Sequence, residues 1–322
     1  MLAFQVDEIG KPPVLRNIPA PKPGKGQVRL KIAACGLNFA DLLMLQGKYQ
    51  EMPATPFTLG MELAGEITAL GKDVTGLQTG DRVAVFANSG GLAEAGCFSA
   101  AACTKIPDTM PYTEAAAFLI AYGTSHLALD HRAQLQPGET LLVLGAAGGV
   151  GLTAVEIGKH MGARVIACAR GAAKLEIARA AGADHLIDSD TPDLRGALRA
   201  LGGVDIVYDA VGDPAFMEAL HATLPEGRLI PVGFAGGEVP QIPANLLLVK
   251  NLTVIGLYWG GYLKFAPRIL GQSLSTLLQW YTAGGLHPHI SNVLLLDQAA
   301  DALEILRSRK STGKVVVMMP GT

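Results

Sequence analysis

The sequence predicts an α/β protein with two domains, in which a domain built on a doubly wound parallel sheet interrupts a β-rich domain. The length predicts the number of domains, because 322 residues are too many for one ordinary core. Hydrophobic residues make up 49% of the chain, enough to fill two cores. The order of the apolar runs predicts the sheets, because the first part reads as short strands and the middle part alternates strands with helices.

The β-rich part covers residues 1 to about 120. Glycine and proline turns separate its apolar runs, which is typical of short strands in a compact, partly open barrel. The segment Asn38–Gln46, between two of these runs, reads as a helix. The strand-like runs are Gln27–Ala33, Glu62–Ala69, Arg82–Phe86 and Cys97–Ile106.

The stretch Leu141–Gly151, LLVLGAAGGVG, predicts the start of the second sheet. Four apolar residues run into a turn of glycine and alanine, and an apolar pattern with helical spacing follows. Strand, tight turn and helix form the opening unit of a dinucleotide-binding domain. Gly148 and Gly149 let the backbone approach a pyrophosphate, and Gly151 lets the helix pack against the strand. Ala146 stands where the first glycine of this pattern is usual.

The later strands of this domain alternate with helical segments. They are Arg164–Ala169, Asp205–Asp209, Arg228–Val232 and Thr253–Gly256. A long apolar helix at Ala115–Leu129 leads into the domain. The chain then returns to the first domain through two helices and a closing strand, at Pro267–Ala283, Asp297–Arg307 and Lys314–Met319. We therefore assign residues 1–122 and 258–322 to the β-rich domain and residues 123–257 to the nucleotide-binding domain.

The composition excludes several classes of function. The formal net charge is −2 and no basic stripe is present, so we expect no nucleic-acid partner. Uncharged runs are shorter than the ~20 apolar residues that span a membrane. The opening MLAFQVDEIG is typical of a strand and not of a signal peptide, so we expect a cytoplasmic protein without membrane contact. The four cysteines form no CxxC pair or zinc spacing, so we expect no metal site.

Four short runs resemble motifs of the medium-chain dehydrogenase/reductase superfamily, and the resemblance extends over essentially the whole chain. The runs are GMELAG at Gly60–Gly65, GDRV at Gly80–Val83, AAGGVG at Ala146–Gly151 and GAD at Gly182–Asp184. The resemblance implies a GroES-like, partly open β-barrel catalytic domain and a Rossmann nucleotide-binding domain. It also implies a homodimer, joined along an edge strand at Thr253–Leu257.

Two substitutions indicate the branch of the superfamily. Zinc-dependent members place a cysteine in a GxCxxD-like run and a histidine in GHE. In this sequence Asn38 replaces the thiolate in GLNFAD, and Met61 replaces the imidazole in GME. Neither side chain suits a catalytic zinc site. The chain therefore resembles the zinc-free NADPH:quinone oxidoreductase group.

The end of the second strand predicts the cofactor. An acidic residue there would accept the ribose 2′-hydroxyl of NAD, but Ala169 occupies the position. Arg170 follows it, and Lys174 lies one helical turn later. Two cations beside a small neutral residue favour charge-assisted hydrogen bonds to a 2′-phosphate, so we expect NADPH. The same two cations are also compatible with a solvated helix start.

The remaining cofactor contacts are implied by the resemblance alone. Two of these residues, Phe234 and Leu257, are equally compatible with core packing. The residues expected to bind the cofactor are Asn38, Thr124, Ala147, Gly148, Gly149, Val150, Arg170, Lys174, Val211, Gly212, Gly233, Phe234, Leu257, Tyr258 and Arg309.

The resemblance also implies three residues of the active site. Asn38 is expected to donate its amide to the acceptor oxygen or to orient the nicotinamide ribose, and Tyr49 to hydrogen-bond the acceptor. Asp41 is expected to hold the local helix as a buried partner. Leu43 replaces a tyrosine that related enzymes often carry between Asp41 and Tyr49, which makes the pocket more apolar.

The expected activity is NADPH-dependent reduction of a quinone or an α,β-unsaturated carbonyl without zinc. A neighbouring branch with the same cofactor turn reduces enoyl thioesters. A non-catalytic NADPH-binding protein would carry the turn as well. The sequence leaves these three functions open.

Overall fold

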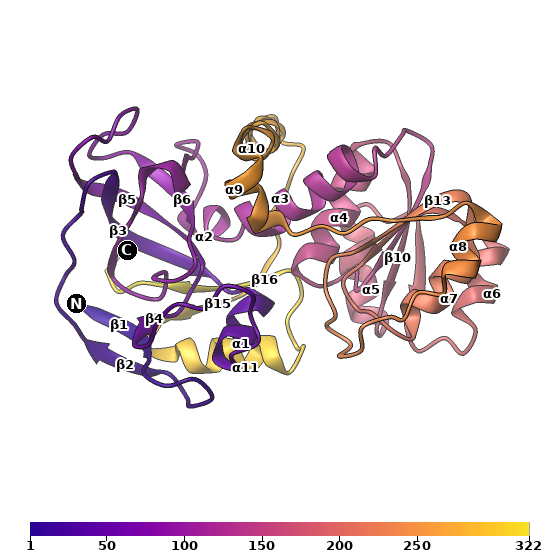
Figure 1. The fold of residues 1–322 in the computed structure, drawn as a ribbon, viewed down its shortest axis with the longest axis horizontal. Coiled ribbons are helices and arrows are strands. Elements are labelled where there is room, and N and C mark those ends of the chain that lie inside the picture. The colour runs from indigo at the N-terminus through magenta and orange to yellow at the C-terminus, as the bar shows by residue number, and fades with distance from the viewer. Residues whose placement is uncertain (322) are drawn as a thin grey trace. The chain divides into compact units, whose positions relative to one another are not determined.

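Residues 1–321 are described by a computed structural model and form two compact units (Figure 1). The first unit comprises Met1–Ile120 and the segment from Pro288 onward, and the second comprises Ala121–His287. The chain thus returns to the first unit after His287, whereas the sequence analysis placed this return at residue 258.

The difference at residues 258–287 comes from α10 (Pro267–Thr282). Its buried Ser273 hydrogen-bonds Nδ1 of His126 across 2.8 Å, and Trp280 packs against the rings of His126 and His160. These partners all lie in the second unit. The apolar spacing of the sequence predicts the helix itself but not the surface on which it packs.

The first unit is a β-rich domain with two sheets. The larger sheet has seven strands in the order β15-β16-β3-β5-β6-β8, with β7 also paired to β3. Its strands are β3 (Gln27–Gly36), β5 (Glu62–Leu70), β6 (Arg82–Phe86), β7 (Ala95–Ser99), β8 (Cys103–Lys105), β15 (Ile290–Leu295) and β16 (Lys314–Met318). The smaller sheet contains β1 (Leu2–Val6), β2 (Val14–Asn17) and β4 (Phe57–Thr58). In Figure 1 the yellow β16 lies beside β3, so the end of the chain completes the first domain.

Alternate side chains along β3 point into the core of this unit. Val28, Leu30 and Ile32 are completely buried, as a strand with one face on a core requires. The single strand expected at Cys97–Ile106 is wrong, because a 3₁₀ turn at Ala100–Ala102 divides it into β7 and β8.

Two helices of the first unit flank the predicted active-site residues. The helix α1 (Phe39–Leu45) confirms the helical reading of residues 38–46, and α11 (Ala299–Arg307) packs against it. The first turn of α1 is fixed locally, since the carboxylate of Asp41 accepts the backbone N–H of Asn38 across 2.8 Å.

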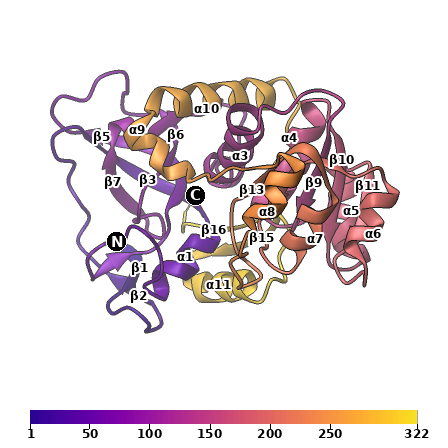
Figure 2. The same ribbon diagram turned by 45° about the vertical axis from the view of Figure 1, so that its right-hand side comes forward.

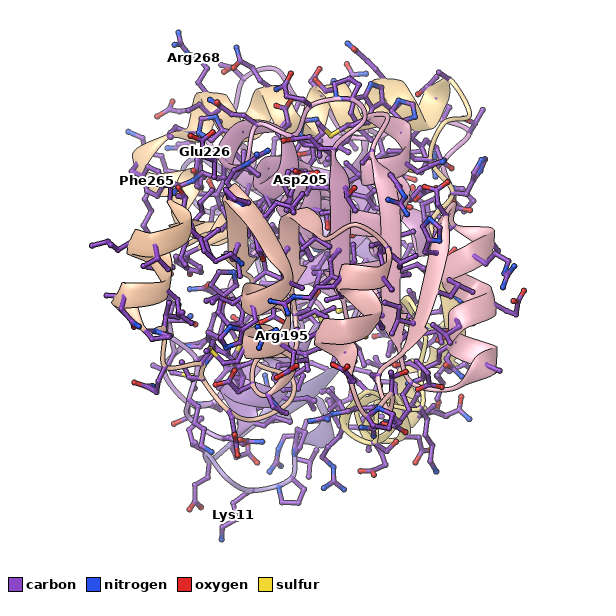
Figure 3. The ribbon with its side chains drawn as sticks, turned by 90° about the vertical axis from the view of Figure 1, so that its right-hand side faces the viewer. Lys11, Arg195, Asp205, Glu226, Phe265 and Arg268 are labelled. Atoms are coloured by element: carbon purple, nitrogen blue, oxygen red, sulfur yellow. The ribbon has the colours of Figure 1, made fainter. Side chains whose placement is uncertain are left out.

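The second unit has a six-stranded, wholly parallel sheet in the order β11-β10-β9-β12-β13-β14. This is the strand order of a doubly wound dinucleotide-binding fold, which the sequence analysis predicted. The strands are β9 (Thr140–Leu144), β10 (Arg164–Ala169), β11 (His185–Asp188), β12 (Val204–Asp209), β13 (Thr223–Pro231) and β14 (Thr253–Val254). Asp205, labelled in Figure 3, accepts the N–H of Thr140 across 2.8 Å and ties β12 to β9.

Helices cover both faces of this sheet. On one face α6 (Leu194–Ala200), α7 (Ala215–Ala222) and α8 (Ala244–Lys250) share a core with Leu142, Ile166 and Val207 (Figure 2). On the other face α4 (Gly149–His160) approaches closely enough that a Cβ on Gly158 would lie 2.4 Å from Leu141. The chain order reverses between β9 and β12, which is where ligands bind in such sheets.

The long helix expected at Ala115–Leu129 is confirmed from Leu119 onward and is broken at residues 116–118. The segment contains α2 (Tyr112–Ala115), α3 (Leu119–His126) and a π-helical turn at Leu127–Arg132. The start of α3 is set by a distant residue, because the carboxylate of Glu62 accepts the N–H of Ile120 across 2.8 Å. Across residues 1–321, no helix combines the length and the hydropathy needed to cross a bilayer.

Candidate active site

Three of the glycines after β9 differ in why glycine occupies the position. Gly145 has a φ of +75°, a conformation that L side chains rarely adopt. A Cβ on Gly151 would lie 2.1 Å from the carbonyl oxygen of Gly145, so packing of α4 requires glycine there. A Cβ on Gly148 would meet only that oxygen, at 3.4 Å, and its φ is −80°. Neither backbone conformation nor packing therefore requires glycine at position 148. The absence of a side chain there instead gives a ligand room to approach the backbone.

Ala146 is tolerated at the position of the usual first glycine. Its side chain is completely buried, and the positive φ of the turn belongs to Gly145 instead. The departure from the common pattern therefore leaves the shape of the turn intact.

The N-terminus of α4 follows this turn and has the properties of an anion site. Its N-cap is Gly148, so no side chain caps the first turn, and that turn contains no acidic residue. Gly149 and Val150 begin the helix, and Ala147 is buried just before it. The free N–H groups and the positive end of the helix dipole favour a phosphate here.

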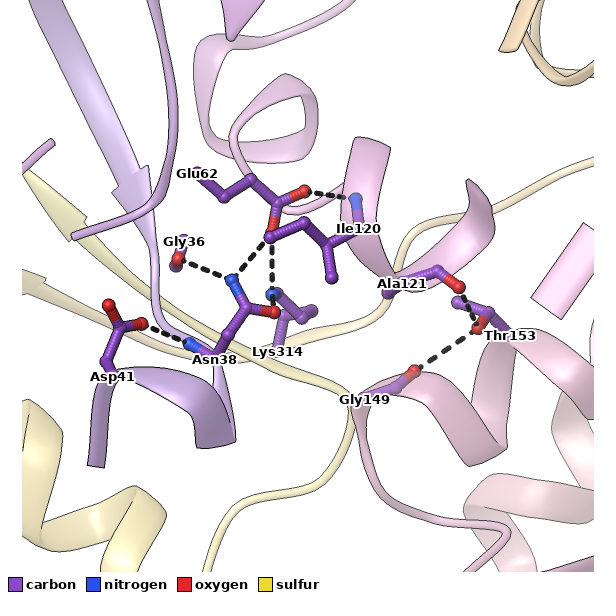
Figure 4. Close-up of polar contacts among 9 residues, drawn as sticks. All are labelled: Gly36, Asn38, Asp41, Glu62, Ile120, Ala121, Gly149, Thr153 and Lys314. Carbon is purple, nitrogen blue, oxygen red and sulfur yellow. Dashed lines mark hydrogen bonds and ion pairs between the residues drawn. The ribbon is translucent and has the colours of Figure 1, made fainter. Parts of the chain in front are cut away.

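A buried hydroxyl network fixes the start of α4. The hydroxyl oxygen of Thr153 lies 3.0 Å from the carbonyl oxygen of Ala121 and 3.4 Å from that of Gly149, either of which can accept its hydrogen (Figure 4). The hydroxyl of Ser125 lies 2.8 Å from that of Thr153 and 3.0 Å from that of Tyr208. The network joins α3, α4 and β12, so the helix terminus is held rigidly.

The end of β10 carries the predicted 2′-phosphate cations. Arg170 is exposed, and its Nε donates to the carboxylate of Asp190 across 3.1 Å. Lys174 is half-buried on α5 (Ala172–Ala180). Asp188, the last residue of β11, and Asp190 were not among the predicted cofactor residues, although the acidic run DSD was visible in the sequence.

The turn after β12 is held by a carboxylate that the sequence analysis also missed. Asp209 accepts the N–H groups of Val211, at 2.8 Å, and Gly212, at 3.0 Å. Burial raises the pKa of Asp209 to about 6. Gly212 has a φ of +90° and no space for a Cβ, whereas a Cβ on Gly233 would lie no closer than 3.6 Å to any neighbour. The N–H groups of Val211 and Gly212 are therefore engaged, and Gly233 has the more open backbone.

The other predicted cofactor residues are distributed over both units. In the second unit Thr124 and Leu257 are half-buried, while Phe234 and Tyr258 are exposed. In the first unit Arg309 is exposed just after α11.

A buried polar cluster surrounds Asn38 in the first unit. We call Asn38, Glu62 and Lys314 the Asn38 cluster (Figure 4). The ammonium of Lys314 lies 2.9 Å from Oε2 of Glu62 and 2.7 Å from Oδ1 of Asn38. Glu62 is completely buried at the start of β5, and Lys314 is buried at the start of β16.

These contacts fix the orientation of the Asn38 amide. An ammonium only donates and a carboxylate only accepts, so Oδ1 must face Lys314 and Nδ2 must face Glu62. Nδ2 donates to Oε2 of Glu62 across 3.0 Å and to the carbonyl oxygen of Gly36 across 3.2 Å. Both amide hydrogens are therefore engaged, and the side chain offers a ligand only the remaining lone pair of Oδ1.

The other two predicted catalytic residues lie on or just after α1. Asp41 is completely buried, and burial raises the pKa of its carboxyl group to about 7. Tyr49 is half-buried and packs against the core of the first unit.

Comparison with known proteins places this arrangement in a family. The alcohol dehydrogenase GroES-like domain matches residues 24–111, and the zinc-binding dehydrogenase domain matches residues 149–278. A quinone oxidoreductase-like protein 2 homologue from Nematostella vectensis is 42% identical over 322 residues, covering 98% of this chain and 88% of its own length. The chain belongs to the quinone oxidoreductase branch of the medium-chain dehydrogenase/reductase superfamily.

Solved structures of this branch agree with the assignment. The quinone oxidoreductase of Thermus thermophilus, determined also as its complex with NADPH, is 34% identical with a TM-score of 0.87, covering 99% of this chain and 100% of that one. A mycobacterial protein solved in complex with NADPH is 30% identical with a TM-score of 0.92, covering 99% of each chain. The resemblance and the fold class expected from the sequence are confirmed.

A zinc ion does not fit the side chains present at Asn38 and Met61. Oδ1 of Asn38 already faces the ammonium of Lys314, which would repel a second cation. The thioether of Met61 is buried in the core. Within residues 1–321, no group of three or more histidine, cysteine or acidic side chains is arranged to hold a metal ion.

Proposed function

We propose that this medium-chain reductase transfers a hydride from NADPH to a quinone or an α,β-unsaturated carbonyl compound without a zinc ion. The observation that carries the proposal is the N-terminus of α4, which Gly148 caps and which lies where the strand order of the parallel sheet reverses. Gly148 is free of packing demands there, as expected for a backbone that a pyrophosphate approaches. The NADPH complexes of two relatives support the choice of cofactor.

The chain supplies binding and orientation for this reaction. Bound NADPH would supply a hydride from C4 of its nicotinamide. The first turn of α4 binds the pyrophosphate, and Arg170 and Lys174 bind the 2′-phosphate. Asn38 accepts a hydrogen bond from the bound ligand, because its geometry leaves an acceptor and no donor. Of the two roles expected for Asn38, this favours orientation of the nicotinamide ribose, whose hydroxyls are donors.

Stabilisation of the developing oxyanion then depends on another donor. Tyr49 carries a phenol in the first unit, and we assign it the hydrogen bond to the acceptor oxygen. A proton from Tyr49 or solvent would neutralise the oxyanion. Tyr49→Phe should lower the turnover number about tenfold and leave the Kd for NADPH unchanged. An unchanged turnover number would remove Tyr49 from the mechanism.

A screen of acceptors tests the proposed reaction. NADPH oxidation is followed with quinones, alkenals and enoyl-CoA esters, using protein whose zinc content has been measured. Oxidation that depends on quinones or alkenals supports the proposal. Faster oxidation with enoyl-CoA esters would assign the thioester reductase function instead. NADPH binding without any acceptor-dependent oxidation would indicate a non-catalytic binding protein.

We also propose that the chain forms a cytoplasmic homodimer through β14. This strand ends the sheet and pairs only with β13 among the strands of residues 1–321. Leu248 and Val249 of the neighbouring α8 are 76% and 67% exposed. Leu248→Glu should convert the dimer to a monomer in sedimentation experiments, and a monomeric wild-type protein would contradict the proposal.

A further inference from the structure

Two carboxylates at the end of β11 surround the cation assigned to the 2′-phosphate. Asp188 accepts the N–H of Gly171 across 3.1 Å through Oδ2 and the N–H of Asp190 across 3.0 Å through Oδ1. Asp190 in turn accepts a hydrogen bond from Nε of Arg170 across 3.1 Å. Asp188 thus fixes both the turn that follows Arg170 and the backbone of the residue that pairs with it.

We propose that Asp190 determines cofactor specificity by competing with the 2′-phosphate of NADPH for Arg170. The inference rests on the proposed function, since it concerns the cofactor of the same site. A guanidinium that already pairs with a carboxylate must exchange it for a phosphate carrying close to two negative charges. NADH has no 2′-phosphate and encounters no such exchange. Asp190 therefore weakens NADPH binding selectively and narrows the preference for NADPH over NADH.

The exchange is possible because the ion pair is exposed. The side chains of Arg170 and Asp190 are 73% and 65% exposed, and such pairs contribute little to stability. The carboxylate nevertheless stays near the phosphate, because its backbone N–H remains bonded to Asp188. Repulsion between Asp190 and the phosphate therefore persists after Arg170 has turned to the ligand.

Asp188 is a poorer candidate for the same role. Both of its carboxylate oxygens accept backbone N–H groups, and its side chain is half-buried. It is also the last residue of β11, whereas the carboxylate that binds a ribose hydroxyl in NAD-dependent folds lies at the end of the second strand, here β10. We therefore assign Asp188 to support of the loop and Asp190 to specificity.

The test is the affinity of four proteins for NADPH and NADH, measured by calorimetry without any acceptor. Asp190→Asn keeps the shape and the backbone bond and removes the charge. We expect it to tighten NADPH binding about 3- to 10-fold and to change NADH binding less than about 2-fold, with the gain shrinking at high salt. Arg170→Met should weaken NADPH binding, and the double variant should show no gain from Asp190→Asn.

A matched control separates this local effect from net charge. Glu176→Gln removes an equally exposed carboxylate from the pair with Arg179 on α5, and we expect it to leave both affinities unchanged. An unchanged NADPH affinity in Asp190→Asn, an equal gain for NADH, or an equal gain in Glu176→Gln would each overturn the inference. Absence of acceptor reduction would contradict the proposed function alone, because nucleotide binding is measured independently. If the protein bound neither NADPH nor NADH, both the inference and the proposed function would be overturned.

Discussion

Replacing Lys314 by methionine tests whether the Asn38 cluster depends on its ion pair. Methionine matches the length of lysine but removes the ammonium that faces both Glu62 and Asn38. The side chain of Lys314 is 7% exposed and that of Glu62 is completely buried. Water therefore cannot replace the lost ammonium at the carboxylate, and Lys314→Met leaves an uncompensated buried charge.

The distance and the burial set the magnitude. At 2.9 Å, an effective dielectric constant of about 20 gives a Coulomb attraction of about 6 kcal/mol between unit charges. Desolvation of the two groups offsets part of this attraction. Removing one partner of a buried pair commonly costs about 3–5 kcal/mol, and we expect Lys314→Met to lower the free energy of unfolding by that amount.

Urea unfolding of four proteins measures the effect. They are the wild type, Lys314→Met, Glu62→Gln and the double variant. The double variant is the matched control, because a neutral pair of similar volume has no uncompensated charge and should lose much less stability than Lys314→Met alone.

Two outcomes would refute the reasoning. If Lys314→Met lowered the free energy of unfolding by less than about 1 kcal/mol, the ion pair between Glu62 and Lys314 would contribute no more than a solvent-exposed pair does. Additive losses in the double variant would show that Glu62 and Lys314 act independently.

Three further predictions concern stability and cofactor binding. Burial raises the pKa of Asp41 to about 7, so between about pH 4 and pH 7 the folded chain holds a proton that the unfolded chain has released. Wild-type stability should therefore fall as pH rises through this window, by at most about 4 kcal/mol, and denaturation of Asp41→Asn should show a flatter profile. Gly151→Ala should destabilise the protein by about 1–3 kcal/mol, because its Cβ would lie 2.1 Å from a carbonyl oxygen. Gly148→Ala should leave stability within about 1 kcal/mol of wild type but weaken NADPH binding about tenfold, and equal affinities would place the ligand elsewhere.

The elements that could be predicted from the sequence are those with their own local signal. The strand at Arg164–Ala169 has the predicted bounds, since a buried parallel strand is a continuous apolar run between breakers. The division of Cys97–Ile106 could not be predicted, because the turn at Ala100–Ala102 contains no glycine or proline. The break before Leu119 depends on Glu62, a residue far away in the sequence.

The same distinction applies to the candidate site. Asn38 and Asp41 were predicted from the recognisable run GLNFAD alone. Lys314 precedes three valines and reads as an ordinary strand start, so its partnership with Glu62 depended on the antiparallel pairing of β3 with both β5 and β16. Two opposite charges, each followed by apolar residues at the start of a strand, were the available signal for a buried ion pair.

The most direct test of the central claim is the isotope effect on acceptor-dependent NADPH oxidation. Protein dialysed against a chelator, with its metal content measured, is mixed with an enone and NADPH deuterated at C4. We predict oxidation that requires the acceptor, slows on deuteration, and leaves deuterium on the carbon of the product. Oxidation independent of the acceptor, or activity that returns only when zinc is added, would contradict the account.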